Sequence, residues 1–319
     1  MPACRLIDED LTDCEQDLSL DYELRLATNI TTQLETELSL ETEVSVATSL
    51  RSYLNDIFTD RAHDVDLSFY DVVGDSTRLH HEQHIMNANQ TSYTLNIPVH
   101  RYMHLGLANL ERNGGILSLQ SDGTCHGSRL QQLQADTLSP HRQGVFTARL
   151  PMDVREGEDQ EFKVNLFMAN CAAALVLDTL GSHVKDIRVL ASGFATAFDV
   201  ADSLFRFQHP QIIRADKVAV EGPGSPLCFA TVNFPSRMPE ATKAEGDKPA
   251  LWELRVYVTL PGGSVTENTL SISDPLPAAH LEILKATVYP NGALESDDKT
   301  VGISVTLDWK PGTEHEVIL

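Results

Sequence analysis

The chain has 319 residues, of which 42% are hydrophobic and 22% charged, so it is long enough for about two domains and too apolar for global disorder. Its formal net charge of -22 argues against binding to nucleic acid or to an anionic lipid surface, because both need clusters of Lys and Arg and no such run occurs. No apolar run approaches the roughly 20 residues that a membrane-spanning helix needs.

The first residues of the chain combine two cysteines with an acidic cluster. Cys4 is followed by Asp8-Glu9-Asp10 and Leu11, and a second cysteine, Cys14, comes before a segment in which apolar and polar residues alternate. A cysteine near the terminus, a short acidic spacer and a β domain are the layout of a bacterial surface lipoprotein. We therefore expect Cys4 to carry the lipid. The few residues before Cys4 cannot form a signal peptide, so this expectation requires a leader that the sequence does not contain.

Patterns typical of short strands recur through the chain. The segment 300–309 is the clearest, because Val, Ile, Val, Leu and Trp alternate there with small or polar residues. Tight turns are predicted at Pro261-Gly262-Gly263 and at Asn291-Gly292. Many short strands separated by Gly, Pro and Asn predict an all-β fold of sandwiches rather than a parallel α/β sheet. The predicted strands are 17–27, 64–72, 91–99, 102–108, 161–168, 173–178, 186–191, 228–234, 251–260, 265–272, 281–289 and 300–309.

One helix and one domain boundary stand out. A short helix is predicted over residues 43–58, where apolar residues recur at spacings of three and four, and we expect it to pack across an open sheet edge of the N-terminal domain. A charged run within residues 151–160 interrupts two strand-rich regions, which predicts domains at 1–155 and 156–319. The segment 235–249 is predicted to be a long exposed loop of the second domain.

Histidines around Glu82 are the residues that most suggest catalysis. The stretch His81-Glu82-Gln83-His84 is one residue shorter than the H-E-x-x-H motif, with which a helix places two imidazoles on one metal. His80 and His84 have the required spacing, but Glu82 is then displaced from the catalytic position. Because the segment lies between strand patterns, we predict an exposed loop, with a weak metal site and a catalytic zinc as the alternatives. The other histidines of this half are His63, His100 and His104.

Acidic and aromatic residues give weaker candidates. Asp297-Asp298 with Glu295, and Asp71 with Asp75, could bind calcium but lack the Asp-x-Asp-x-Asp-Gly spacing, so surface turns are favoured. No two of the 46 acidic residues are singled out as a glycosidase pair. Trp252 and Trp309 occupy inward-facing strand positions, which favours a core role over a sugar-stacking one.

Cysteine spacing and nucleotide motifs also argue against an enzyme. Cys171 and Cys228 lie in apolar strands and are predicted to be buried packing residues, and no C-x-x-C pair occurs among the five cysteines, which include Cys125. The sequence has no G-x-S-x-G, no P-loop and no dinucleotide fingerprint. We therefore predict a non-enzymatic protein with no catalytic residues, no cofactor and no metal.

The N-terminal element Cys4-x-x-x-Asp8-Glu9-Asp10-Leu11-x-x-Cys14, with the alternating strand after it, resembles the start of the FimB-like fimbrillin anchor subunits of Bacteroidales, a family of fimbrial surface lipoproteins. The resemblance spans nearly the whole chain, and the N-terminal element is its most specific part. The inserted segment 28–60 is longer than in the better-known anchors. Looser similarities to strands of the family lie at 65–75, at 93–98, from Tyr102 to Asn109, and at 305–312.

The resemblance implies two transthyretin-like β-sandwich domains in tandem and a palmitate-type lipid on Cys4 that holds the protein at the cell outer membrane. It also implies a non-enzymatic role in anchoring or starting a fimbria, with a contribution to cell adhesion. The implied partners are fimbrillin subunits, joined by strand exchange, and the membrane itself; a host protein or glycan is a further candidate, and nucleic acid is not.

Two other functions stay open. A carbohydrate-binding surface lipoprotein would need a row of exposed aromatic residues, and aromatic residues make up only 6% of the chain. A hydrolase on a β scaffold is favoured only by the histidine cluster.

Overall fold

The computed structural model of the chain describes residues 17–27, 44–58, 62–74, 76–85, 92–156, 160–181, 184–222, 224–239, 249–296 and 301–309. Cys4, Cys14 and the acidic cluster between them lie outside the described residues, as do Asp75, Asp297, Asp298 and most of the predicted loop 235–249. Among the described helices, none has the length and apolar character needed to cross a membrane.

Strands are the main regular element of the described chain, so the predicted all-β class is confirmed. Each predicted strand is present with ends within about two residues of the predicted ones, and the helix α2 spans Val44–Ile57. In chain order the strands are β1 (Asp17–Ala27), β2 (Asp64–Asp71), β3 (Arg78–Ile85), β4 (Ser92–Pro98), β5 (Arg101–Ala108), β6 (Leu117–Gln120), β7 (Arg129–Gln132), β8 (Thr137–Leu138), β9 (Phe146–Asp153), β10 (Glu161–Met168), β11 (Cys171–Asp178), β12 (Asp186–Ser192), β13 (Ala197–Asp199), β14 (Leu204–Arg206), β15 (Ile212–Arg214), β16 (Asp216–Val218), β17 (Leu227–Asn233), β18 (Trp252–Thr259), β19 (Val265–Ile272), β20 (Leu281–Val288), β21 (Leu294–Glu295) and β22 (Val301–Trp309).

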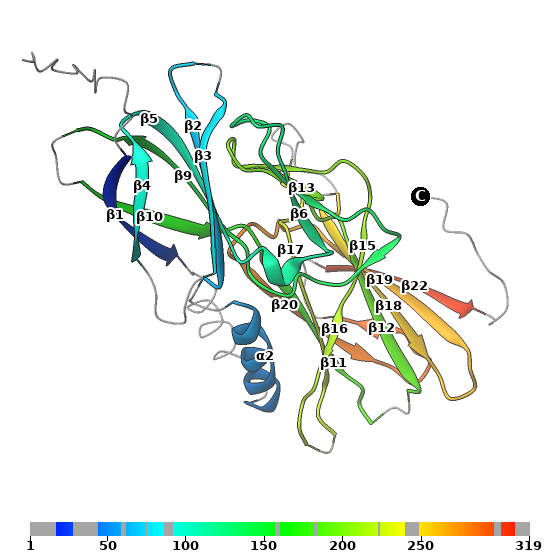
Figure 1. Cartoon of the computed structure of the whole chain (residues 1–319). Helices are drawn as coiled ribbons and strands as arrows, with labels where there is room; N and C mark the ends of the chain where they lie inside the picture. Colours follow the sequence, from blue (N-terminus) through cyan, green and yellow to red (C-terminus); the bar gives the residue numbers. More distant parts are fainter. Residues whose placement is uncertain are drawn as a thin grey trace, which may run out of the picture.

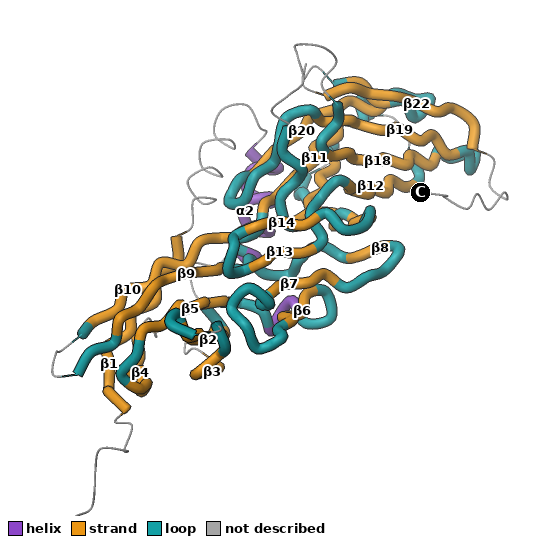
Figure 2. Tube along the Cα trace, turned by 90° about the horizontal axis from the view of Figure 1, so that it is seen from above, coloured by secondary structure: helices purple, strands orange, loops and turns teal. Residues whose placement is uncertain are grey.

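These strands form four sheets, which lie along an elongated molecule (Figures 1 and 2). A seven-stranded sheet has the order β3-β2-β5-β9-β10-β1-β4, and β1 lies inside it, parallel to β10 and antiparallel to β4. A five-stranded sheet, β16-β17-β11-β20-β21, and a six-stranded sheet, β22-β19-β18-β12-β15-β8, make up the other end. A small sheet, β14-β13-β7-β6, lies between the two ends in Figure 2.

Strand β11 shows how the sequence builds the two layers at the C-terminal end. All seven residues from Cys171 to Leu177 are buried, because both faces of this strand are covered. Alternate residues, such as Ala173 and Leu175, join Val189 and Val256 in the core between the five- and six-stranded sheets. The intervening residues, such as Ala174, join the core that α2 covers. The five- and six-stranded sheets therefore enclose one sandwich core, while two tandem transthyretin-like domains stay a prediction.

The helix packs against an edge, as expected, but the edge belongs to the C-terminal half of the chain. It contacts β16 and β17 at one end of the five-stranded sheet, and its residues Val46, Leu50 and Leu54 are fully buried. Tyr53 also donates a hydrogen bond from its hydroxyl to Asp216 on β16 over 2.9 Å. The apolar face of the helix therefore belongs to a core with residues from both halves of the chain.

The sheets also do not separate at residues 155 and 156. Strand β10, which follows that boundary, lies inside the seven-stranded sheet, where it pairs with β1 and β9. Conversely, two strands that precede the boundary join strands that follow it: β7 pairs with β13, and β8 pairs with β15. The charged run near residue 155 is thus a connection between two strands of one sheet, and three of the four sheets mix strands from both sides of the predicted boundary.

The segment with the clustered histidines is a strand, not the predicted loop. Residues Arg78–Ile85 form β3, which pairs with β2 and occupies one end of the seven-stranded sheet. Its two aliphatic side chains, Leu79 and Ile85, are exposed, so the strand has no buried apolar face. The alternation by which the other strands were recognised is therefore missing, as is usual for a polar strand at a sheet edge.

Candidate functional site

Strand β3 places its histidines by the two-residue repeat of a strand. His80, Glu82 and His84 share one face, and the Nε2 atoms of both histidines lie 2.7 Å from the two oxygens of the Glu82 carboxylate. On the opposite face, Asp66 of β2 binds His81 over 3.0 Å and accepts a hydrogen bond from Gln83 over 2.7 Å. The Glu82 carboxylate thus bridges His80 and His84. In the H-E-x-x-H motif a metal ion would occupy the position between the two imidazoles.

The remaining histidines of this half do not join that group. His100 binds Asp71 over 2.9 Å, and His104 is buried, with its ring stacked on Phe69 at a centroid distance of 4.3 Å. His63 contributes its backbone N–H to the side chain of Asn109. Within the described part of the chain, no three His, Cys, Asp or Glu residues are arranged to hold a metal ion. The structure therefore brings His80 and His84 together through Glu82 and gives His63, His100 and His104 other partners.

Two buried histidines are neutral at pH 7. Burial lowers the pKa of His104 to about 4, although its Nδ1 lies 3.1 Å from the carbonyl oxygen of Ser68. Burial also lowers the pKa of His141 to about 3. Both ring nitrogens of His141 face side-chain amide nitrogens: Nδ1 lies 2.5 Å from that of Asn170, and Nε2 lies 2.7 Å from that of Gln132. Both rings lack access to solvent and act as packing and hydrogen-bonding groups.

The cysteines that the structure describes are buried and free. Burial raises the pKa of Cys228 to about 12 and also raises that of Cys171, so neither thiol supplies a thiolate nucleophile at pH 7. This confirms both as packing residues. Cys125 is buried as well, and burial raises its pKa.

The aromatic and acidic candidates are also structural where they are described. Trp252 lies in the sandwich core, and its indole N–H donates to the carbonyl oxygen of Asp274 over 3.0 Å. The core role predicted for it is confirmed, whereas the side chain of Trp309 lies outside the described residues. Asp71 pairs with His100 and also accepts a hydrogen bond from the backbone N–H of Val73 over 2.8 Å. Of the second predicted calcium group, Glu295 is described, and it accepts a hydrogen bond from the Tyr289 hydroxyl over 2.5 Å.

Strand β22 leaves one side of its backbone open. It forms the end of the six-stranded sheet and pairs with β19 from Val301, opposite Ile272, to Trp309, opposite Val265. Val301 and Ile303 pack against the sandwich core, while the side chain of Val305 is 39% exposed. Within the described residues no strand pairs with the other side of β22, so its outward N–H and C=O groups are available to another chain.

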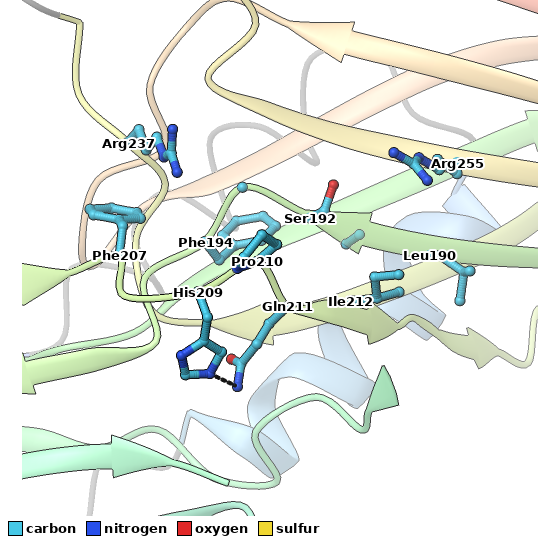
Figure 3. Close-up of a pocket in the computed structure, with 12 residues that line it drawn as sticks. Leu190, Ser192, Phe194, Phe207, His209, Pro210, Gln211, Ile212, Arg237 and Arg255 are labelled. Carbon is cyan, nitrogen blue, oxygen red and sulfur yellow. Dashed lines mark hydrogen bonds between the residues drawn. The ribbon is translucent and has the colours of Figure 1, made fainter. Parts of the chain in front are cut away.

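A pocket of about 210 Å³ opens between β12, β15 and the segment that joins β14 to β15. In Figure 3, Phe207 and His209 lie at one end and Arg255 of β18 at the other. The guanidinium of Arg237 lies over the ring of Phe207, with 5.6 Å between its carbon and the ring centroid. None of these pocket residues was singled out from the sequence, because they come from separate segments without a common motif.

The comparisons with known proteins identify the fold. No family model matches the sequence, and no curated protein matches it significantly. Among solved structures, a candidate adhesin from Bacteroides ovatus is 12% identical, and the match covers 97% of this chain and 100% of that chain with a TM-score of 0.56. The fimbrial anchor protein Mfa2 from Porphyromonas gingivalis is 9% identical, with 90% and 97% of the two chains covered and a TM-score of 0.50.

A third similar structure has a different description. It is a candidate polysaccharide-binding protein from Bacteroides thetaiotaomicron, which is 10% identical, with 88% and 98% of the chains covered and a TM-score of 0.51. The structural neighbours are thus adhesins and fimbrial proteins of Bacteroidales, as the resemblance in the sequence predicted. At these identities the likeness establishes a shared fold over most of the chain.

Proposed function

We propose that this protein is a non-enzymatic cell-surface subunit that anchors or starts a fimbria and contributes to cell adhesion. The observation that carries the proposal is the fold, which the chain shares over 90% of its length with a fimbrial anchor protein. The chemistry of the described residues agrees with it. The histidines of β3 are paired to carboxylates, and the described thiols are buried.

We further propose that the subunit is held at the outer membrane by a lipid on Cys4, which precedes β1 by an acidic spacer. Lipidation would require a leader in the precursor, ending in a lipobox directly before Cys4. Reading the genomic sequence upstream of the codon for Met1 would test this, and a gene without such a leader would remove the lipid anchor from the proposal.

Coupling to the fimbria is proposed to use strand pairing at the open side of β22. A partner strand would gain main-chain hydrogen bonds along nine residues, and the exposed Val305 would contact its side chains. The substitution Val305→Asp would place a charge in this contact while leaving the partly buried Val301 and Ile303 in place.

The test is to measure binding of purified fimbrillin subunits from the same bacterium to the wild type and to Val305→Asp. The matched control is Val44→Asp, which adds the same charge at a residue that is 83% exposed on α2. We expect Val305→Asp to lose binding while it stays folded and the control to bind normally. Equal binding by all three proteins would exclude β22 as the contact, and absence of binding by the wild type would exclude the fimbrial role itself.

A carbohydrate-binding surface protein is the second candidate function. It is favoured by the similarity in fold to the candidate polysaccharide-binding protein. A row of exposed aromatic residues would support this function. The described residues do not supply one at the pocket, where the aromatic residues are Phe194 and Phe207, and Trp252 is buried. Binding of neutral polysaccharides at micromolar concentration would make it the preferred function.

A further inference from the structure

The pocket between β12, β15 and the segment 207–211 has an unusual charge for this protein. The chain carries a net charge of -22, yet the residues that line the pocket include two arginines and one histidine and no carboxylate. Among the described residues, the ion pair of Arg255 is with Glu253, at the long distance of 3.8 Å. The pocket is therefore a positively charged site on an acidic molecule, and such a site attracts anions.

The position of Arg237 suits a planar anion. Its guanidinium is held over the ring of Phe207 at 5.6 Å, a cation–π contact that limits its rotation. In the described part of the chain no carboxylate forms an ion pair with this guanidinium, so its N–H groups remain available. A guanidinium matches the two oxygens of a carboxylate with two parallel hydrogen bonds.

The walls of the pocket combine apolar and hydrogen-bonding groups. Leu190, Phe194, Pro210 and Ile212 supply apolar surface, while Ser192 and His209 add polar side chains. Figure 3 shows these residues around the same hollow, with Phe207 at the end below Arg237. This combination suits a ring that has both C–H faces and hydroxyl groups at its edge.

Gln211 forms part of the pocket wall. The side chain is 5% exposed, and its amide nitrogen donates to the carbonyl oxygen of Leu133 over 2.9 Å, which fixes the orientation of the amide. Its oxygen is buried beneath the surface of the pocket. Gln211 therefore gives the pocket its shape, while the polar contacts to a ligand come from Arg237, Ser192 and His209.

The volume limits the size of the ligand. At about 210 Å³ the pocket is smaller than the roughly 300–1,000 Å³ of sites that hold drug-sized molecules, so one sugar-sized ring fits and an oligosaccharide does not. We propose that this pocket binds a single acidic sugar residue, with its carboxylate on Arg237, its ring between Phe207 and Pro210, and a hydroxyl toward Ser192. This binding site is independent of the contact proposed at β22.

The test is calorimetric titration of the full chain with glucuronate. The variant Arg237→Gln removes the carboxylate contact, and Arg149→Gln, an exposed arginine on β9 in another sheet, is the control for loss of one positive charge. We expect binding of glucuronate by the wild type and by the control, and at least a tenfold weaker affinity for Arg237→Gln, which corresponds to about 1.4 kcal/mol.

Two further titrations separate an acidic sugar from simpler ligands. Glucose should bind at least tenfold more weakly than glucuronate, because it lacks the carboxylate, and inorganic phosphate should not compete, because it lacks the ring. Equal affinity of glucuronate for Arg237→Gln and Arg149→Gln would overturn the proposal. So would competition by phosphate at the same concentration as glucuronate, which would show an unspecific anion site, and so would absence of binding by the wild type.

Discussion

Acidification should destabilise the protein through its two buried histidines. His141 is fully buried, between the amides of Asn170 and Gln132, and His104 is buried against Phe69. Burial lowers the pKa of His141 to about 3 and that of His104 to about 4, from 6.5. The unfolded chain takes up these two protons as pH falls through 6.5, whereas the folded chain does so only near pH 3 to 4. Stability from these residues is therefore complete above pH 6.5 and is lost as pH falls.

The size of the loss follows from the same pKa values. The unfolded state holds about a quarter of a proton at each histidine at pH 7 and nearly a whole one at pH 5, whereas the folded state holds almost none at either pH. Integrating the proton difference over these two pH units gives about 2 kcal/mol for each histidine, and about 4 kcal/mol for the two together.

The measurement is urea unfolding at pH 7 and pH 5 of the wild type and of His141→Gln, which cannot take up the proton. The variant His126→Gln, at an exposed histidine, controls for the removal of one imidazole. We expect the difference in unfolding free energy between the two pH values to shrink by about 2 kcal/mol in His141→Gln alone. Since His141→Gln leaves every carboxylate of the chain in place, an unchanged difference in this variant would refute the assignment of the loss to this residue.

Further outcomes follow from the environments of single residues. Val305→Asp, at an edge residue that is 39% exposed, should cost about 1 kcal/mol in unfolding free energy, whereas Val256→Asp in the sandwich core should cost more than about 4 kcal/mol; similar thermal melts for the two would contradict the edge position of β22. His84→Ala should change the unfolding free energy by no more than about 0.5 kcal/mol, and His81→Ala by about 1 kcal/mol, because Asp66 loses a hydrogen bond; stoichiometric zinc in the purified protein would show a metal site after all. Gly193→Ala should be strongly destabilising, because its φ is +92° and a Cβ would lie 2.6 Å from the Cα of Trp252; a wild-type melting temperature would refute that packing. Cys4→Ser should abolish labelling of the full precursor by a fatty-acid analogue, and equal labelling of variant and wild type would exclude Cys4 as the acylated residue.

Strands with one buried face were predictable from the sequence because their alternation is local. The predicted limits of β1 agree with the observed strand, and those of β22 differ by one residue. Strand β3 was missed because its position at a sheet edge allows polar residues on both faces. The short strands β6, β7 and β13–β16 were missed for a related reason, since three or four residues are too few to show a period.

The arrangement of the elements was less predictable, because it depends on contacts between distant residues. The apolar stripe of α2 indicates that the helix is covered, but nothing in residues 43–58 shows that β16 and β17 cover it. The charged run near residue 155 has the composition of a domain linker, yet the strand after it returns to the first sheet. For the pocket, Arg237 and Phe207 become neighbours only through the fold, and no spacing in the sequence links them.

The central claim is that this subunit holds a fimbria on the cell surface. Deleting its gene in the source bacterium, and counting cell-attached and shed fimbriae by electron microscopy, tests that claim most directly. We predict that attached fimbriae fall sharply, that fimbriae appear in the medium or fail to form, and that the wild-type gene supplied in trans restores attachment. Unchanged numbers of attached fimbriae in the deletion strain would contradict it.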